Sequence, residues 1–334
     1  MEIKGISTVI ASVLMLMIVI ALGGTTYLFI SNTFTSKTAT AFEVINEVNG
    51  TVTIRNIGTE TISKITATLD GDPVKIAVIP KTNPITNGLV AYYKMNEGSG
   101  STTSDNSGNG NTGTLKPSCP NCPSWDNGVE DKALRFDGVD DYVGINIPQY
   151  QYPNGYSLCL WAKKLSTRNA WDIILGRWDT TAGVEHLSWQ NSGDNRITIY
   201  FAFSDGTSDY VSNPAATELN RWYFICAIYD GNIKLYIDGN LANSKYVGKL
   251  LGYQNLELRI GMKSSGYYPS NSIVDEVMVF NRALSASEIQ QLYSGLVSPG
   301  ELATIKPLTS LTKGTHTLRL CTSSMCSTAI LTII

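Results

Sequence analysis

Cys119 and Cys122 form a Cys-Pro-Asn-Cys motif, a spacing that suits a redox-active pair or half of a zinc site. No second Cys-x-x-Cys follows, and the two histidines of the chain, His186 and His316, are remote from the motif. The ligand set of a structural zinc ion is therefore not indicated. We expect instead a local disulfide that stabilises a long loop.

Four further cysteines lie in apolar segments or beside a turn. Cys321 and Cys326 stand on the two sides of the last turn, so a hairpin disulfide is natural there. Cys159 and Cys226 each lie inside an apolar segment, where they either pair across strands or stay as buried thiols; we favour pairing. An even number of cysteines is consistent with an oxidising, extracellular environment.

The residue patterns of common hydrolases are missing. Retaining hydrolysis of a glycosidic bond needs two carboxylates about 5–5.5 Å apart, which alternate residues of one strand provide. No Glu-x-Asp occurs, and neither a Gly-x-Ser-x-Gly elbow nor a His-Glu-x-x-His pair is present. The sequence therefore predicts a protein that is not an enzyme.

Aromatic rings in loops can serve as apolar platforms for sugars, with Asn, Asp and Arg supplying hydrogen bonds at the rim. The candidate ligand-binding residues are the aromatic residues in Gly-, Ser- and Asn-rich segments: Trp171, Trp178, Trp189, Tyr267, Tyr268, Tyr150 and Tyr152. Trp161 and Trp222 lie in regular apolar segments, so we expect them in the core.

Residues 6–30 carry no charge and follow a leader, residues 1–5, that contains Lys4 and ends in Gly5. About 20 apolar residues span a bilayer, whereas the apolar part of a secretory signal is shorter and ends at a cleavage site. Segment 6–34 therefore predicts a transmembrane helix with Lys4 on the inner side of the membrane.

This N-terminus resembles that of archaeal type IV pilins and archaellin-like proteins, in which a short charged leader precedes a long apolar helix. The resemblance implies cleavage between Gly5 and Ile6 by a prepilin peptidase. It also implies that the helix first anchors the chain in the membrane and later packs in the core of a surface filament. The following residues would then face the outside, where Asn49, in the chain's only Asn-x-Ser/Thr sequon, is a candidate glycosylation site.

Two segments of similar character flank an aromatic-rich region. Residues 35–87 and 297–334 have no Trp or Tyr and alternate Thr with Ile or Val, the pattern of half-buried strands. Each is too short to bury a core alone, so we expect one small pilin-like β-domain made of both, with residues 88–296 inserted between them. The net charge of −3 and the lack of a basic stripe argue against nucleic acid as a partner.

Five stretches of the inserted region occur in a familiar order: GLVAYYKMNEGSG…DNSGNGNTGTL (88–115), ALRFDGVDDYV (133–143), YSLCLWAK (156–163), RWYFICAIYDGNIKLYIDGNLA (221–242) and VDEVMVFNRALSASEIQQLYSG (274–295). Together they resemble a laminin-G-like, concanavalin A-like jelly roll. Independently, Asp-Gly pairs at 230–231 and 238–239 predict a hairpin, and only SASEIQQLYSG predicts a helix, capped by Ser285 or Ser287. We expect an antiparallel jelly-roll β-sandwich.

The resemblance also implies a structural Ca²⁺ ion, because jelly rolls of this family often hold one on acidic loop residues and backbone carbonyls. Calcium takes roughly six to eight oxygen ligands. The candidate ligands are Glu97, Asp137, Asp140, Asp141 and Asp275. The alternative is that these carboxylates only cap turns.

Together these features predict a mainly β chain with an N-terminal transmembrane or pilin helix, a small β-domain and an inserted jelly roll. We expect a cell-surface, pilin-like subunit that displays a module for binding glycans or surface glycoproteins. Two alternatives stay open: a monomeric membrane-anchored adhesin with the same head, and a glycoside-active enzyme.

Overall fold

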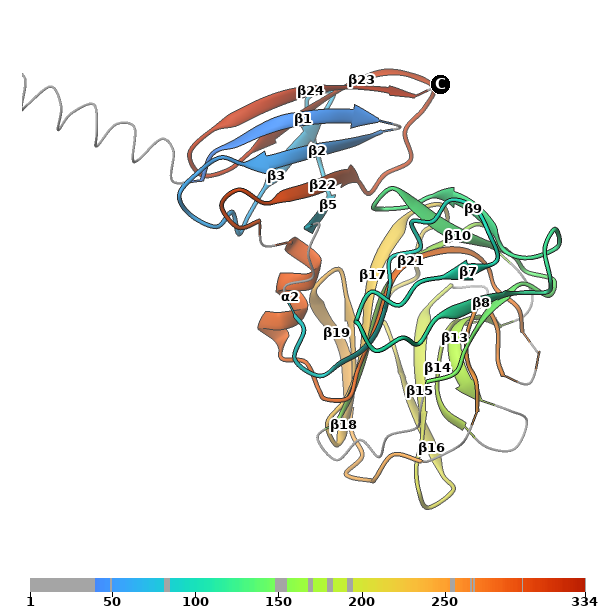
Figure 1. Cartoon of the computed structure of the whole chain (residues 1–334). Coiled ribbons are helices and arrows are strands. Elements are labelled where there is room, and N and C mark those ends of the chain that lie inside the picture. Colours follow the sequence, from blue (N-terminus) through green and yellow to red (C-terminus); the bar gives the residue numbers. More distant parts are fainter. Residues whose placement is uncertain are drawn as a thin grey trace, which may run out of the picture.

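The computed structural model describes residues 40–48, 50–80, 85–147, 155–167, 171–178, 183–190, 195–252, 256–264, 266, 268–295 and 297–333. Within these residues the chain is mainly antiparallel β-structure, as predicted, with one α-helix, α2 (Ala286–Ser294) (Figure 1). Residues 1–5, the apolar segment 6–34 and the sequon at Asn49 lie outside the described residues. In the described part of the chain, no helix combines the length and apolar character that crossing a bilayer requires.

Two four-stranded sheets form a small β-domain, and each sheet takes strands from both flanks of the chain. One sheet has the order β1 (Phe42–Val48), β2 (Thr51–Asn56), β22 (Leu302–Pro307), β5 (Ile76–Pro80). The other has the order β24 (Cys326–Ile333), β23 (Gly314–Cys321), β3 (Thr66–Leu69), β4 (Asp72–Val74). Alternate residues such as Val52, Ile54 and Leu318 are buried in the core between the sheets, as a period-two pattern requires.

The jelly roll consists of two eight-stranded sheets. The first, called the open sheet below, has the order β16 (Ser208–Ser212), β15 (Ile197–Ala202), β14 (Gly183–Trp189), β13 (Asp172–Trp178), β20 (Leu258–Ile260), β11 (Tyr142–Ile145), β8 (Gly113–Lys116), β7 (Thr102–Thr103). The second, the covered sheet, has the order β19 (Asn240–Tyr246), β18 (Asn232–Ile237), β17 (Trp222–Tyr229), β12 (Tyr156–Lys164), β21 (Asn271–Phe280), β10 (Lys132–Asp137), β9 (Ser124–Asn127), with β6 (Leu89–Tyr93) paired to β21.

One apolar core fills the space between the open and the covered sheets. It includes Leu187 and Ile199 of the open sheet and Leu158, Ile225 and Val277 of the covered sheet. Burying such side chains stabilises the fold by about 1.5–3 kcal/mol each relative to leaving them in water, before the entropy of ordering is subtracted.

A second apolar cluster covers the other face of the covered sheet. Trp161, Trp222 and Phe224 of this sheet pack with Ile289 of α2 and with Ile79 of the small β-domain. The core positions predicted for Trp161 and Trp222 are thus confirmed. The two domains consequently share buried apolar surface, while α2 and strands β13–β15 lie on opposite sides of the jelly roll (Figure 1).

Helix α2 begins and ends at residues that satisfy its backbone. Ser285 accepts a hydrogen bond from the Glu288 N–H, and the Glu288 carboxylate accepts one from the Ser285 N–H, so the capping box is complete. The helix ends at Gly295, whose φ is +62°. A Cβ at this position would lie 2.3 Å from the Val78 carbonyl oxygen, so no larger residue fits there without movement of β5.

The structure contains the three predicted disulfides. They join Cys119 to Cys122, Cys159 to Cys226 and Cys321 to Cys326. The second links β12 to β17 within the covered sheet, and the third closes the hairpin of β23 and β24.

Candidate functional site

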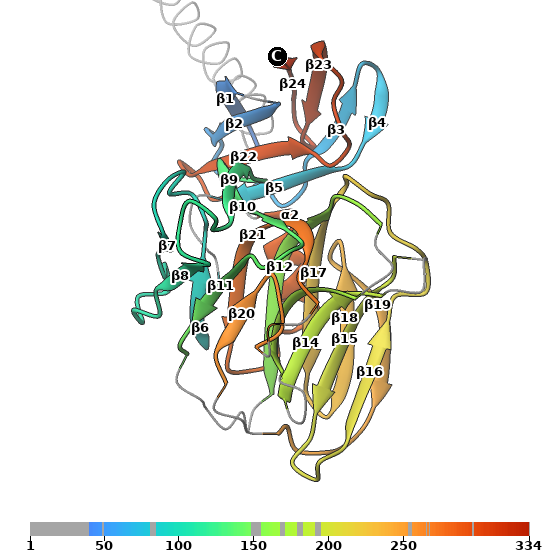
Figure 2. The same ribbon diagram turned by 90° about the vertical axis from the view of Figure 1, so that its right-hand side faces the viewer.

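The open sheet carries a row of aromatic side chains on the face that looks away from the core. Register places His186 of β14 opposite Tyr200 of β15, and Tyr200 opposite Tyr210 of β16. The neighbouring residues Leu187 and Ile199 are buried in the jelly-roll core. Because successive residues of a strand face opposite sides, the aromatic residues lie on the outer face of these strands, which Figure 2 shows side by side.

The rings of this row stack on one another. His186 and Tyr200 have ring centroids 4.4 Å apart at 24°, and Tyr200 and Tyr210 have centroids 4.7 Å apart at 27°. Two tryptophans pack edge-on against the stacked rings. The ring centroids of Trp178 and His186 are 4.9 Å apart with an interplanar angle of 80°, and those of Trp171 and Tyr200 are 6.0 Å apart with an angle of 75°. Tyr210 stays 47% exposed, so the row ends in an accessible ring.

Lys263 and Tyr268 complete the group next to Trp178. The Lys263 Nζ lies 5.9 Å from the centre of the Trp178 ring and 5.2 Å from that of Tyr268, which is 42% exposed. Below, "aromatic face" means Trp171, Trp178, His186, Tyr200, Tyr210 and Tyr268. Burial, and then the charge of Lys263, lower the pKa of His186 to about 3, so its imidazole is neutral at physiological pH.

A buried ion pair supports the aromatic face from within the core. The Arg177 Nε donates to Glu185 Oε1 at 2.8 Å, and its Nη2 donates to Oε2 at 3.3 Å. The Tyr156 hydroxyl donates a further hydrogen bond to Oε1. Burial raises the pKa of Glu185, while the Arg177 charge and hydrogen bonds oppose that shift. Strands β13 and β14, which carry Trp178 and His186, are therefore tied together underneath the rings.

Polar side chains lie on the same side of these strands, with Thr198 buried and Gln190 and Ser212 partly exposed. Thr198 and Ser212 share a hydrogen bond of 2.8 Å between their hydroxyl oxygens, and the Gln190 amide donates to Ser212 Oγ. Ring surfaces bordered by hydroxyl and amide groups match a sugar, which has apolar C–H faces and a hydroxyl rim. A surface of this kind is suited to recognising a sugar.

The structure brings together three of the seven predicted ligand-binding aromatics. Trp171, Trp178 and Tyr268 belong to the aromatic face, whereas Tyr150, Tyr152 and Tyr267 lie outside the described residues. The prediction for Trp189 is wrong, because this residue is 0% exposed in the core, and its indole N–H donates to Thr217 Oγ1.

Sequence reasoning missed His186, Tyr200 and Tyr210. Their signal is the alternation His186–Leu187 and Ile199–Tyr200–Phe201, which marks half-buried strands. It shows that these residues face outward without showing that they face one another.

The turn between β10 and β11 holds a second group of side chains. Carboxylate oxygens of Asp137, Asp140 and Asp141 lie within 4.8 Å of one another. Asp141 is buried and accepts a hydrogen bond from the Asp137 N–H. Burial, followed by the nearby charges of Asp137 and Asp140, raises the pKa of Asp141 to about 6. Hard oxygen ligands suit Ca²⁺, and three carboxylates supply part of the set that this ion requires.

The other two candidate calcium ligands do not join this group. Glu97 accepts a hydrogen bond from the Ser104 N–H and so caps its own loop. Asp275 is buried and accepts hydrogen bonds from the N–H groups of Val129 and Glu130. Leu134 pairs with Val274 and Asp137 with Asn271, so Asp275 lies beside the opposite end of β10 from the three aspartates of the turn. The five-residue ligand set is thus corrected to three.

Asp275 instead belongs to a buried acidic cluster. Asp275, Glu276 and Glu130 are all buried, the Tyr92 hydroxyl donates to Glu276, and Lys94 lies 3.5 Å from a Glu130 oxygen. Burial raises the pKa of both Asp275 and Glu276 well above the ordinary carboxyl range, and the neighbouring acids add to the shift.

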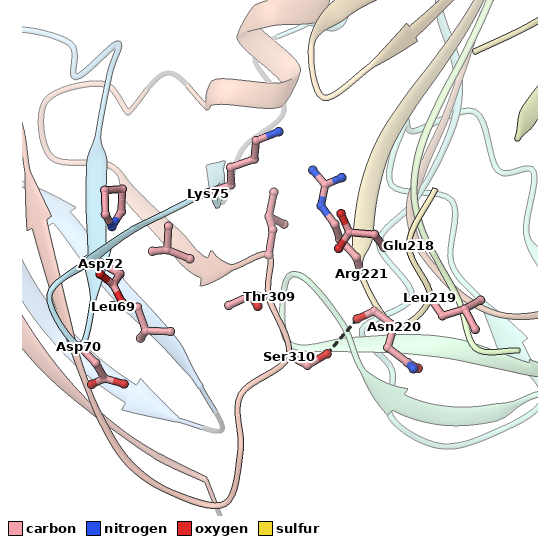
Figure 3. Close-up of a pocket in the computed structure, with 13 residues that line it drawn as sticks. Leu69, Asp70, Asp72, Lys75, Glu218, Leu219, Asn220, Arg221, Thr309 and Ser310 are labelled. Atoms are coloured by element: carbon pink, nitrogen blue, oxygen red, sulfur yellow. Dashed lines mark hydrogen bonds between the residues drawn. The ribbon is translucent and has the colours of Figure 1, made fainter. Parts of the chain in front are cut away.

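A cavity of about 540 Å³ lies between the small β-domain and the jelly roll (Figure 3). Its walls are residues 69–70, 72–75, 218–221 and 308–310. The Ser310 hydroxyl donates to the Asn220 carbonyl across it. Its cations, Lys75 and Arg221, both pair with Asp238, at 3.8 and 2.5 Å. Since internal ion pairs satisfy these charges, we favour the aromatic face as the binding site.

The sequence profile of the "Concanavalin A-like lectin/glucanases superfamily" matches residues 137–290. No curated protein matches the chain by sequence. Among solved structures, the binding domain of Paraclostridial Mosquitocidal Protein 1 aligns with a TM-score of 0.52 and 15% identity, covering 62% of this chain and 52% of that one. The receptor binding domain of botulinum neurotoxin D aligns with a TM-score of 0.52 and 14% identity, covering 63% and 53%.

The binding domain of Botulinum Neurotoxin serotype G aligns with a TM-score of 0.50 and 16% identity, covering 61% of this chain and 50% of that one. The chain thus spans about half the length of the solved structures it matches. At such low identity these similarities show the fold alone. The profile match and the shared fold lead to one conclusion: the chain carries a concanavalin A-like, laminin-G-like jelly-roll domain.

Proposed function

We propose that this chain is a glycan-binding protein of the cell surface and that the aromatic face of the open sheet is its binding site. The observation that carries the proposal is the stacked group of rings on and beside β13–β16, in which Tyr210 and Tyr268 are exposed and Trp178 is partly exposed, supported beneath by the Arg177–Glu185 pair. A ring held in place before binding loses little entropy when a sugar packs against it.

The comparisons support recognition as the role of the jelly roll. The matching superfamily takes its name from lectins and glucanases, and the similar solved structures are described as binding or receptor binding domains. The chain lacks the Glu-x-Asp pattern of one group of glucanases. We therefore propose binding without catalysis.

The proposed setting is the outside of the cell. Residues 6–34 have the length and composition of a membrane anchor, and residues 1–5 have the form of a pilin leader. We propose that a prepilin peptidase cuts after Gly5, and that the mature chain assembles into a surface filament which displays the jelly roll. Purifying surface filaments and identifying this chain in them tests the assembly; absence from filaments together with membrane anchoring would favour the monomeric adhesin.

Calcium has a place in this proposal as a structural ion. Asp137, Asp140 and Asp141 would hold it, together with backbone carbonyls and water. The ion would supply charge neutralisation to a turn in which three carboxylates repel one another.

A glycan array with the full-length chain, purified in detergent and run with calcium and with EDTA, tests the function. Trp178→Ala is expected to weaken binding at least about tenfold, which corresponds to 1.4 kcal/mol. The matched control is Tyr246→Ala, which removes an exposed ring from β19 of the covered sheet and should leave binding unchanged. Binding that survives Trp178→Ala would refute the site, and release of shortened sugars during incubation would favour the enzyme.

A further inference from the structure

Among the residues that the structure describes, Lys263 is the cation that lies directly against the tryptophan end of the aromatic face. It follows β20, and its Nζ lies 5.9 Å from the Trp178 ring centre and 5.2 Å from that of Tyr268. A cation between two ring faces is held by their quadrupoles. Its ammonium group therefore occupies a defined position at the end of the rings.

Three other cations around the open sheet are neutralised by acids. Lys245 pairs with Asp209 at 2.7 Å, Lys249 with Asp205 at 2.8 Å, and Arg259 with Glu257 at 2.8 Å. Within the described ranges of the chain, no carboxylate lies within ion-pair distance of Lys263. Its positive charge on this face is thus left without an anionic partner from the described part of the protein.

The environment of Lys263 makes an anionic partner favourable. Partial burial lowers the pKa of Lys263, since the charged form has lost part of its hydration. The charge also reaches the ring stack, where it contributes to the lowered pKa of His186. An anion that arrived beside Trp178 would replace the lost hydration with a charge-assisted hydrogen bond.

We propose that the aromatic face selects acidic glycans, in which a carboxylate or sulfate group pairs with Lys263 while the sugar ring packs against Trp178 or Tyr268. This inference rests on the proposed glycan-binding function and names the class of sugar that it takes. Carboxylate and sulfate present the same chemistry to an ammonium group, namely a delocalised negative charge on oxygen atoms that accept hydrogen bonds.

Matched pairs of sugars that differ only in charge test the inference. Galacturonic acid oligomers are compared with their methyl esters, and 3′-sulfolactose with lactose, by calorimetry on the full-length chain in detergent. We expect the charged member of at least one pair to bind about tenfold more tightly, the gain typical of one hydrogen bond to a charged group. The preference should shrink as salt is raised, because the anchoring charge is partly exposed. Preference within the first pair alone identifies carboxylate, and within the second alone sulfate.

Variants of Lys263 assign the preference to this residue. Lys263→Met should abolish the difference between the charged and neutral members, and Lys263→Arg should keep the difference. Lys249→Met, which removes a cation already paired with Asp205, is the matched control and should leave the difference intact.

Two results would overturn the proposal in distinguishable ways. If charged and neutral members bind equally and Trp178→Ala weakens both, the glycan-binding function stands and the selection for acidic sugars is wrong. If the chain binds none of these sugars and none on the array, the proposed function fails as well. A preference that persists in Lys263→Met would show that another group provides it.

Discussion

Replacing Arg177 by methionine is a direct test of how the aromatic face is supported. Arg177 is 1% exposed and Glu185 0%, and two hydrogen bonds, of 2.8 and 3.3 Å, join them. Arg177→Met leaves the Glu185 carboxylate buried without its cation, while the hydrogen bond from the Tyr156 hydroxyl remains. Loss of one member of a buried ion pair typically costs about 3–5 kcal/mol. Replacing both, as Arg177→Met/Glu185→Leu, is expected to cost about 1 kcal/mol or less, because apolar side chains of similar volume often substitute for a buried pair.

Urea unfolding followed by tryptophan fluorescence measures these free energies, and a pH series sharpens the test. Without Arg177 the folded-state pKa of Glu185 rises further above its unfolded value, so the neutral acid is preferred in the folded state. A raised folded pKa gives stability that is present at low pH and is lost as the pH rises. The penalty of Arg177→Met should therefore be largest at neutral pH and shrink toward pH 4.

The control for this experiment is Arg259→Met on the same sheet. Arg259 pairs with Glu257 at 2.8 Å, but both side chains are partly exposed, so the expected cost is below about 1 kcal/mol. A cost of Arg177→Met as small as that of Arg259→Met, or a penalty independent of pH, would refute the reasoning about the buried pair.

Three further changes test other parts of the structure. Replacing Cys159 and Cys226 by alanine should lower the free energy of unfolding by about 4 kcal/mol, and replacing Cys321 and Cys326 should lower it by about 2 kcal/mol. The difference arises because the first disulfide closes a loop with a sequence separation of 67 and the second one of only 5, and a longer loop loses more entropy in the unfolded chain. Equal losses in urea titrations would contradict this argument. In EDTA, the free energy of unfolding should fall as the pH rises from about 4 through 6, because the folded pKa of Asp141 lies above its unfolded value. Calcium should remove this fall, and Asp141→Asn should abolish the effect of calcium. Identical melting curves in calcium and in EDTA would refute the calcium site. Burial raises the pKa of Glu276, so this residue destabilises the folded state at pH values above its unfolded pKa. Glu276→Gln should therefore raise Tm by at least about 2–4 °C at pH 7 and leave it unchanged below pH 4. A lower Tm at pH 7 would show that the charge of Glu276 is stabilising.

Local sequence patterns predicted much of the fold. Ser285 or Ser287 was predicted to start the helix, and the structure has Ser285 as the cap of α2. Asp230-Gly231 indicated a turn between β17 and β18. These features depend on residues that are neighbours in the sequence, so the sequence alone contains the information.

Features that depend on register were not predictable in the same way. His186 stacks on Tyr200 because β14 and β15 pair in one register, and a shift by one residue would turn one of the two rings into the core. Asp275 and Glu276 are consecutive yet both buried, because both faces of the covered sheet are packed against other parts of the protein. A bulge in β21, where Glu276 has a φ of +53°, further disturbs the simple alternation. Trp189 looked like a loop residue because polar residues follow it, although it is the last residue of β14.

The pairing of β5 with β22 has a mechanical consequence. The jelly roll departs from the small β-domain at Pro80, the end of β5, and the chain returns into β22, where Ala303 lies opposite Pro80. Tension applied to the jelly roll therefore loads two adjacent strands of the small β-domain at the same end. A force along these strands shears β22 lengthwise against β2. The backbone hydrogen bonds between β2 and β22 then resist the force together and do not open one after another. The insertion thus gives the jelly roll two attachment points that divide an applied force between them.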